Sequence, residues 1–228
     1  MKVGDFVEVD YVGRVKDSDE IFDLTREDVA KKENIFNKEF PYKPIVLIVG
    51  SDFIIKGLDE ALQGMTVGEK KKFEIPKDKG FGERKEEMIK VIPLARFKEQ
   101  DMKPYPGAVV NIGSFRGRVV SVDGGRVKVD FNHPLAGKVL EYDLEIKSEI
   151  KEPAERVKAV VKYFTGVEEV DVEIGGKTAG ITIKKDVDVA RPVKKVVSDA
   201  VIKWCGVEMV KFIEVFGKGE GDKGKIEK

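Results

Sequence analysis

The chain has 228 residues, and its 42 lysines and arginines balance 42 aspartates and glutamates, which argues against a general polyanion-binding protein. Its length favours two or three domains. A single cysteine, Cys205, excludes an internal disulfide, and the longest apolar run, Ile45 to Val49, is far shorter than the roughly 20 residues that span a bilayer. The sequence also begins without the apolar run of a secretion signal. We therefore expect a cytoplasmic protein with no membrane partner.

The first 75 residues predict three strands and two short helices. Residues 3–16 alternate polar and apolar side chains, as in a strand with one buried face. A polar stretch at 25–43 predicts a short helix inside a long loop. Residues 45–49 then predict a buried strand. Apolar side chains recur at helical spacing over 58–65, and a further strand is expected at 70–75, so that strand, helix and strand form the core of a first domain.

A small β unit is expected in the middle of the chain. After an apolar-rich stretch at 89–97, short strands are predicted at 108–112, 115–122 and 126–131, the last two joined by a tight Asp-Gly-Gly turn. Residues 139–146 alternate again and can rejoin the first sheet. The small unit is therefore an insertion.

A third part begins at Pro153. The pattern predicts a helix at 154–164 and a hairpin at 168–183, followed by a helix at 192–204 and a strand at 208–215. These elements make a compact α+β domain. The tail at 217–228 is rich in glycine and lysine and has too little apolar surface to offset the entropy of ordering, so we expect it to be disordered.

Few side chains can carry covalent or metal chemistry. His133 is the only histidine and Cys205 the only thiol. The chain therefore has too few of these residues for a metal site built from several histidines, and a serine–histidine catalytic scheme is not expected. His133 lies in a turn-rich stretch, which favours a role in loop hydrogen bonds over catalysis. Cys205 is interpreted as a buried small apolar residue. We expect neither a metal nor a cofactor.

One long segment carries a family resemblance. Residues 50–82 read GSDFIIKGLDEALQGMTVGEKKKFEIPKDKGFG, preceded by Val9-Asp10-Tyr11 and Ile21-Phe22-Asp23 and followed downstream by Tyr142-Asp143-Leu144-Glu145-Ile146. This ordered series closely resembles the FK506-binding protein (FKBP) family of peptidyl-prolyl cis/trans isomerases. An insertion after Phe81-Gly82 that ends in NHPLAGK resembles the SlyD branch, whose insert-in-flap domain binds unfolded chains. The 25–43 loop and the part after Pro153 resemble an archaeal long variant.

The resemblance implies an α+β fold, with a bent antiparallel β-sheet around a short helix, an inserted small β domain and a C-terminal α+β domain. The implied domain limits are 1–83 with 132–152 for the isomerase, 84–131 for the insert, 153–216 for the C-terminal domain and 217–228 for the tail. The implied activity accelerates proline-limited protein folding without a cofactor. The implied partners are unfolded or partly folded polypeptides that contain proline.

The resemblance also implies a proline pocket. Its expected catalytic residues are Tyr11, Phe22, Asp23, Ile55, Phe81 and Tyr142, and its expected substrate-binding residues are Ile45, Ile54 and Leu58. Ile55 would bind a substrate carbonyl through its backbone N–H, and Asp23 would supply the one charge. Two departures matter, because Phe81 replaces a tyrosine of the family and Leu58 a tryptophan. The histidine-rich tail of SlyD is absent, so nickel delivery is not expected.

Three further interpretations concern surfaces. Apolar residues of the insert predict a chaperone surface made of Ile92, Leu94, Phe97, Tyr105 and Phe115, although most of them must also build the insert's core. A nucleic-acid-binding barrel would use Arg116, Arg118, Arg126, Lys128 and Phe115, but Asp123 and Asp130 dilute this patch and no nucleic acid is expected. The C-terminal helices have ordinary apolar faces, and a homodimer through the edge of the C-terminal sheet is a further hypothesis.

Overall fold

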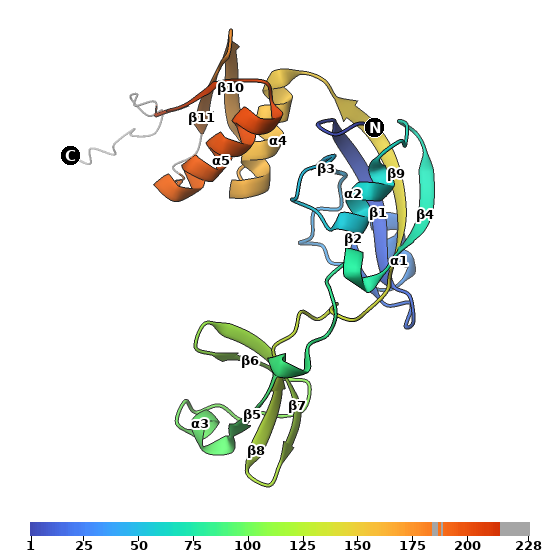
Figure 1. Cartoon of the computed structure of the whole chain (residues 1–228), viewed down its shortest axis with the longest axis vertical. Helices are drawn as coiled ribbons and strands as arrows, with labels where there is room; N and C mark the ends of the chain where they lie inside the picture. Colours follow the sequence, from blue (N-terminus) through green and yellow to red (C-terminus); the bar gives the residue numbers. More distant parts are fainter. Residues whose placement is uncertain (184–186, 188, 215–228) are drawn as a thin grey trace, which may run out of the picture. The chain divides into compact units, whose positions relative to one another are not determined.

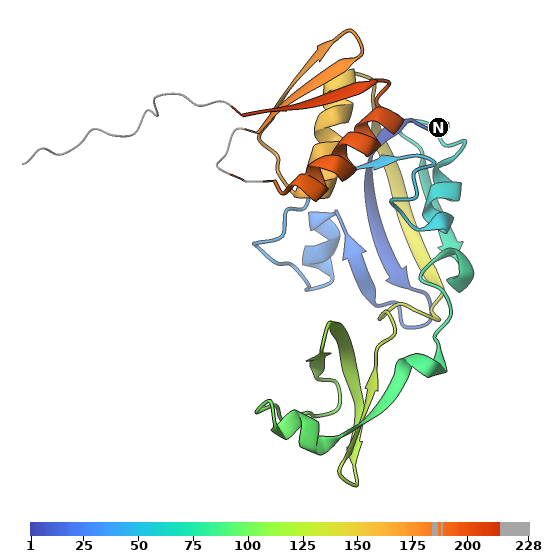
Figure 2. The same cartoon turned by 60° about the vertical axis from the view of Figure 1, so that its left-hand side comes forward.

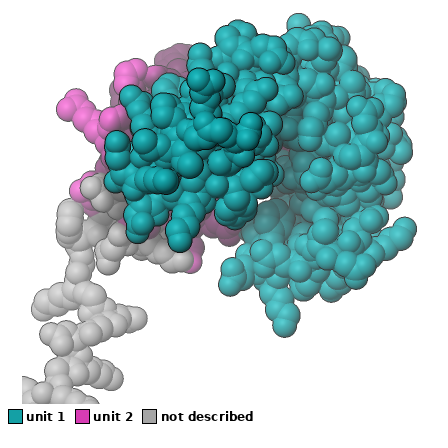
Figure 3. All heavy atoms as spheres, turned by 90° about the horizontal axis from the view of Figure 1, so that it is seen from below, with its two compact units in different colours: residues 1–3, 9–45, 49–147 teal, residues 4–8, 46–48, 148–228 magenta. Residues whose placement is uncertain are grey.

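The computed structural model describes residues 1–183, 187 and 189–214 (Figure 1). The chain divides into two compact units (Figure 3). Unit 1 holds Met1–Val3, Val9–Ile45 and Val49–Lys147, and unit 2 holds Gly4–Glu8, Val46–Ile48 and the chain from Ser148 onward. The tail expected at 217–228 and the last residue of the strand expected at 208–215 lie outside the described residues. The domain limits drawn from the sequence stay a prediction.

One sheet has five strands, four from the first 75 residues and one from the chain after the insert. Its strands are β1 (Phe6–Val15), β2 (Ile21–Leu24), β3 (Ile45–Ile48), β4 (Lys70–Ile75) and β9 (Leu140–Ile150). They lie in the order β2-β1-β9-β4, and β3 pairs with β1. The alternation predicted for the last strand is confirmed, since the side chains that alternate along β9 from Leu140 to Ile146 are buried. This burial fixes the strand's register, because a slip of one residue would bring its charged side chains into the core.

The helix α2 (Lys56–Leu62) lies against this sheet, as the sequence predicted (Figure 1). Gly57 allows the close approach, because a Cβ there would lie 2.4 Å from Cγ2 of Ile75 on β4. The predicted helix in the long loop is α1 (Glu27–Lys32), whose Ala30 is buried with Val12 and Leu24. Two short 3₁₀ turns, η1 (Lys77–Lys79) and η2 (Glu86–Met88), follow β4.

The insert is a four-stranded antiparallel sheet with one short helix. Its elements are β5 (Ile89–Pro93), α3 (Leu94–Lys98), β6 (Val109–Ile112), β7 (Phe115–Asp123) and β8 (Arg126–Asp130), and the strand order is β5-β8-β7-β6. The three strands predicted from the sequence are confirmed. The fourth strand, β5, and α3 lie in the stretch that was described only as apolar-rich.

The insert has a core of its own, and this corrects part of the predicted chaperone surface. Ile92 is 9% exposed and Phe97 is fully buried, together with valines from β6, β7 and β8. These two residues were expected to face unfolded chains, and that expectation is wrong because a small sheet needs its largest apolar side chains to fill its interior. Leu94 is half-buried against the same core.

The C-terminal part is the α+β unit that the sequence predicted. Its elements are α4 (Pro153–Thr165), β10 (Val170–Gly175), β11 (Thr178–Ile183), α5 (Arg191–Trp204) and β12 (Met209–Ile213). Strands β10 and β11 pair antiparallel, and β12 joins β11 in parallel. The two helices pack on each other and cover the sheet (Figure 2). Their buried faces are valine-rich, as the periodicity indicated.

Candidate functional site

Aromatic rings gather around Tyr142 on β9. The ring centroid of Tyr142 lies 5.7 Å from Tyr11 on β1, 5.8 Å from Phe22 on β2 and 6.0 Å from Phe73 on β4. Phe22 meets Tyr142 edge-on at 77°, whereas Phe73 is stacked at 11°. These four residues are called the Tyr142 cluster. Such edge-on and stacked pairs are the arrangements that aromatic quadrupoles prefer, so the cluster is a firm apolar wall.

One carboxylate faces this wall. The hydroxyl of Tyr11 donates a hydrogen bond to Oδ2 of Asp23 at 2.5 Å, and the Asp23 side chain is otherwise exposed. Burial raises the pKa of Tyr11 well above its ordinary value, and the bond to Asp23 raises this pKa further. Burial likewise raises the pKa of Tyr142. Both phenols are therefore neutral donors near neutral pH, and Asp23 is the acceptor.

Thr25 fixes the backbone of Tyr11. The Tyr11 N–H donates to Oγ1 of Thr25 at 2.9 Å, and the Thr25 N–H donates to the Tyr11 carbonyl at 3.0 Å. The Thr25 hydroxyl donates in turn to Oδ1 of Asp10 at 2.8 Å. Thr25 is 5% exposed, so these partners replace water that cannot reach the group. The sequence reasoning gave no role to Thr25.

Gly13 makes room for the Phe22 ring. Gly13 pairs with Asp23 across β1 and β2, and the register shifts immediately after it, between Gly13 and Arg14. A Cβ on Gly13 would lie 2.6 Å from Cζ of Phe22, closer than real Cβ atoms come to another carbon. The ring therefore occupies the space that any larger residue at position 13 would need.

The other predicted pocket residues lie on β3 and around the start of α2. Ile45 on β3 is 38% exposed, whereas Leu58 in α2 is buried. Ile54 and Ile55 are half-buried just before the helix. Ile55 caps α2, and its carbonyl accepts from the N–H groups of Leu58 and Asp59. The place of these four residues in a common pocket with the Tyr142 cluster stays a prediction.

Phe81, which was expected in the proline pocket, has its ring contact with His133. Its ring stacks on His133, with centroids 4.2 Å apart and planes 2° apart, and it makes no ring contact with the Tyr142 cluster in the part of the chain that the structure describes. The structure therefore brings together Tyr11, Phe22, Asp23 and Tyr142 and pairs Phe81 with the histidine. Phe73 was missed by the sequence reasoning. Its signal was the alternation of β4, which places it opposite Tyr142 in the antiparallel register.

The two chain segments that enter and leave the insert are bonded to each other. They are residues 81–85 and 130–137, called the junction below. The Gly137 N–H donates to the Gly82 carbonyl at 2.7 Å, and Arg84 forms an ion pair with Asp130 at 2.7 Å. The Asn132 side chain bonds both the N–H and the carbonyl of Lys85 at 2.9 Å. These bonds fix the junction locally.

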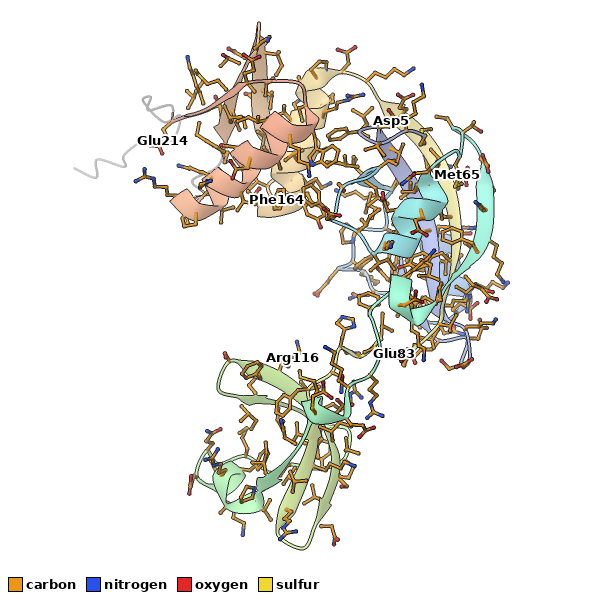
Figure 4. All side chains as sticks on the ribbon, viewed as in Figure 1. Asp5, Met65, Glu83, Arg116, Phe164 and Glu214 are labelled. Carbon is orange, nitrogen blue, oxygen red and sulfur yellow. The ribbon has the colours of Figure 1, made fainter. Side chains whose placement is uncertain are left out.

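A cleft of about 1460 Å³ in unit 1 runs beside the junction. Phe22 of the Tyr142 cluster lines it together with Glu83, Arg116 and His133, and Glu83 and Arg116 are labelled in Figure 4. Tyr11, Asp23 and Tyr142 are not among its lining residues. Phe22 is thus the residue that the aromatic wall and this cleft share.

Comparison with known proteins assigns the family. A model of the FKBP-type peptidyl-prolyl cis-trans isomerase family matches residues 1–98, and a model of the FKBP26 IF domain matches residues 90–135. A short-type peptidyl-prolyl cis-trans isomerase of Methanocaldococcus jannaschii is 38% identical over 155 residues, which cover 68% of this chain and 96% of that protein. The chain belongs to the FKBP-type peptidyl-prolyl cis-trans isomerase family. It is therefore an isomerase of this type, and the recognition from sequence is confirmed.

Further relatives of this chain are also named FKBP-type isomerases. A probable FKBP-type 16 kDa isomerase of Pseudomonas fluorescens is 32% identical over 47% of this chain and 73% of its own length. The isomerase SlyD of Haemophilus influenzae is 29% identical over 52% of this chain and 64% of its own length. A solved isomerase of Pseudomonas syringae pv. tomato superposes with a TM-score of 0.33 at 20% identity, covering 66% of this chain and 65% of that chain.

The α+β fold predicted from the sequence is confirmed. None of the helices formed by residues 1–183 and 189–214 has the length and apolar character that a membrane span requires.

Proposed function

We propose that the Tyr142 cluster and Asp23 form the site where this isomerase binds the proline of its substrate and rotates the preceding peptide bond. The observation that carries the proposal is the convergence of three aromatic rings on Tyr142 beside the Asp23 carboxylate, which accepts a hydrogen bond from Tyr11. A pyrrolidine ring is apolar and compact, so rings that exclude water favour its burial.

The same surroundings favour the rotation. An X-Pro bond isomerises slowly because amide resonance must be lost, at a barrier of about 18 to 20 kcal/mol. The twisted amide is less dipolar than the planar one, so it loses less solvation when it leaves water for an apolar wall. No covalent bond is made or broken. The wall therefore lowers the barrier by binding the transition state better than the ground state.

Asp23 has two tasks in this scheme. Its carboxylate holds the Tyr11 hydroxyl, and through it the orientation of the Tyr11 ring. It also presents negative charge toward the carbonyl carbon that rotates. Ile55, just before α2, and Leu58 in α2 complete the site, with the N–H of Ile55 directed at a substrate carbonyl. Ile45 and Ile54 contribute further apolar surface.

Catalysis of proline-limited refolding tests this site. We expect Phe22→Ala to lower the catalytic efficiency at least tenfold, because it removes the ring that closes the wall. Asp23→Ala should lower it too, and Asp23→Asn should fall between this variant and the wild type because it keeps an acceptor for Tyr11. Tyr163→Ala, which truncates an exposed tyrosine of α4, serves as the control. Undiminished rates in the Phe22 and Asp23 variants would refute the site.

We further propose that the insert holds unfolded client chains near this site. Tyr105 is 66% exposed and Phe115 is 65% exposed, and Val91 and Val109 add further exposed apolar area to the same small domain. Exposed aromatic side chains of this kind favour contact with apolar segments of an unfolded chain. Binding there would raise the local concentration of the client's prolines at the isomerase site.

The chaperone proposal separates protein substrates from short peptides. Deleting residues 84–131, or replacing Tyr105 and Phe115 together by serine, should reduce catalysis of protein refolding much more than catalysis on a short peptide. Tyr163→Ser is the matched control for loss of an exposed tyrosine. Equal losses on both substrates would contradict the tethering of clients by the insert.

We also propose that two copies of the chain form a homodimer through the C-terminal part that begins at Pro153. Strand β12 is an edge strand, since it pairs with β11 on one side and its other side is the edge of the sheet. Its Met209 and Ile213 are 52% and 42% exposed, so a second copy could pair along this edge. The molar mass in solution, measured with the full chain and with Met209→Lys, tests this. A monomeric mass for the full chain at all concentrations would contradict it.

A further inference from the structure

His133 is fixed in orientation by two contacts at the junction. Its ring stacks on Phe81 with nearly parallel planes, 4.2 Å between centroids. Its Nδ1 accepts a hydrogen bond from the Leu135 N–H at 3.2 Å. The His133 carbonyl also accepts from the Ala136 N–H at 2.9 Å, so both the side chain and the backbone belong to one turn. A histidine held at its face and at one nitrogen has little freedom left.

These contacts settle which nitrogen can donate. A neutral imidazole carries one proton, and a nitrogen that accepts a hydrogen bond is the one without it. Because Nδ1 accepts from Leu135, the proton lies on Nε2. Within the part of the chain that the structure describes, Nε2 has no hydrogen-bond partner. His133 is exposed, so the fold orients an N–H donor and leaves it open to solvent or to a bound chain.

The donor lies beside the proposed proline site. His133 and Phe22 line the same cleft in unit 1, and Phe22 is part of the Tyr142 cluster. Arg84, which also lines this cleft, is already bound to Asp130 through its Nε and Nη2 atoms. A peptide that places its proline against Phe22 brings backbone carbonyls into this cleft. Each carbonyl that loses water there without a new donor costs free energy.

We propose that the Nε2–H of His133 donates a hydrogen bond to a backbone carbonyl of the client chain next to the proline. This inference rests on the proposed function of the Tyr142 cluster. His133 then acts as a substrate-binding residue whose ring Phe81 and Leu135 hold in place. Since the flanking carbonyl belongs to a peptide group that does not rotate, the bond forms equally in the ground state and the transition state. Its loss raises KM and leaves kcat nearly unchanged.

A pair of substitutions separates the donor from the structural role. His133→Asn keeps a side-chain oxygen that can accept from the N–H two residues later, as asparagine does in turns, but it has no donor at the Nε2 position. His133→Gln is one carbon longer, so its amide nitrogen reaches the Nε2 position, but it gives up the short-range acceptor. Both variants lose the stacking on Phe81 equally. Thermal unfolding of both confirms that each full-length chain is folded.

The measurement is the KM and kcat of each full-length variant on a short prolyl peptide, with Phe22→Ala measured alongside. We expect His133→Asn to raise KM about three- to tenfold, the effect of one lost hydrogen bond, and His133→Gln to stay within about twofold of the wild type. A His133→Asn variant with unchanged KM, or equal losses in the two variants, overturns the donor role while a large loss in Phe22→Ala still supports the proline site. An undiminished Phe22→Ala overturns the site and this inference with it.

Discussion

Gly13 and Phe22 occupy one space in the fold. Gly13 pairs with Asp23 at the irregular end of the β1–β2 ladder, and a Cβ at position 13 would come within 2.6 Å of Cζ of the Phe22 ring. Phe22 reaches Tyr142 because residue 13 has no side chain. The aromatic wall of the isomerase therefore depends on an absent methyl group on the neighbouring strand.

Replacing this glycine by alanine should displace the ring. We expect Gly13→Ala to destabilise the protein by about 1–3 kcal/mol, as overpacking does, and to lower catalytic efficiency on a short prolyl peptide about tenfold. Gly175→Ala on β10 is the matched control, since nothing lies within 4 Å of a Cβ there. Urea unfolding and peptide kinetics of the two variants check the prediction. Wild-type activity in Gly13→Ala would show that the position of Phe22 does not matter.

Thr25 should matter through its hydroxyl. Thr25→Val keeps the shape but leaves the Tyr11 N–H and the Asp10 carboxylate without this partner, and we expect a loss of about 1–3 kcal/mol in the free energy of unfolding. The isomerase activity should fall as well, because Tyr11 loses its support. Thr25→Ser retains the hydroxyl and should stay within about 1 kcal/mol of the wild type. A Thr25→Val variant as stable as the wild type would contradict the role of the hydroxyl.

The core of the insert offers a test of client tethering that keeps the chain complete. A Cβ on Gly117 would lie 2.6 Å from Cγ1 of Val129 and 2.8 Å from Cδ1 of Phe131. Gly117→Ala should destabilise the insert by about 1–3 kcal/mol and reduce catalysis of protein refolding more than catalysis on a peptide. Hydrogen exchange of the β7 and β8 amides reports whether the insert opens more often. Faster exchange with unchanged refolding catalysis would argue against a role for the insert in client binding.

Buried phenols predict a decline of stability at alkaline pH. The pKa values of Tyr11 and Tyr142 are raised above the ordinary 10.0 by burial, so the unfolded chain releases these protons first as the pH rises. The two phenols contribute fully to the free energy of unfolding below pH 10.0. Above this pH the free energy of unfolding falls by about 1.4 kcal/mol per pH unit for each group.

Urea unfolding between pH 10 and 11 measures this slope. Tyr11→Phe should reduce the slope of unfolding free energy against pH by the part that the Tyr11 phenol contributes. Burial also raises the pKa of the Cys205 thiol, to about 12, so both proteins are compared in a Cys205→Ala background. An unchanged slope in Tyr11→Phe would mean that this phenol titrates in the folded protein as it does in the unfolded chain.

The sequence predicted the elements well where one face of the chain is buried. The alternation of residues 139–146 is that of β9, and the helical spacing after Leu58 is that of α2. It predicted less well where burial depends on a small separate core. The run at 89–97 contains a strand and a helix in succession, so it has no single period, and the burial of Ile92 and Phe97 follows from the insert's own interior.

The contacts within the site were harder to predict from the sequence than the secondary structure. Tyr11, Phe22, Asp23 and Tyr142 could be named from the resemblance, and the structure brings them together. Phe73 was hidden in a lysine-rich strand, where its role depends on the register against β9. The stacking of Phe81 on His133 joins residues 52 positions apart, and only the folded junction shows it.

The most direct measurement of the central claim is the cis/trans exchange rate of a short X-Pro peptide, followed by NMR magnetisation transfer in the presence of the full-length chain. With wild-type protein and with the Tyr163→Ala control, we expect exchange far faster than the spontaneous rate, which takes tens of seconds or longer at 25 °C. Phe22→Ala should lose at least nine-tenths of this acceleration while remaining folded. An acceleration by folded Phe22→Ala equal to that of the wild type would contradict the proposal that the rings around Tyr142 are the proline site.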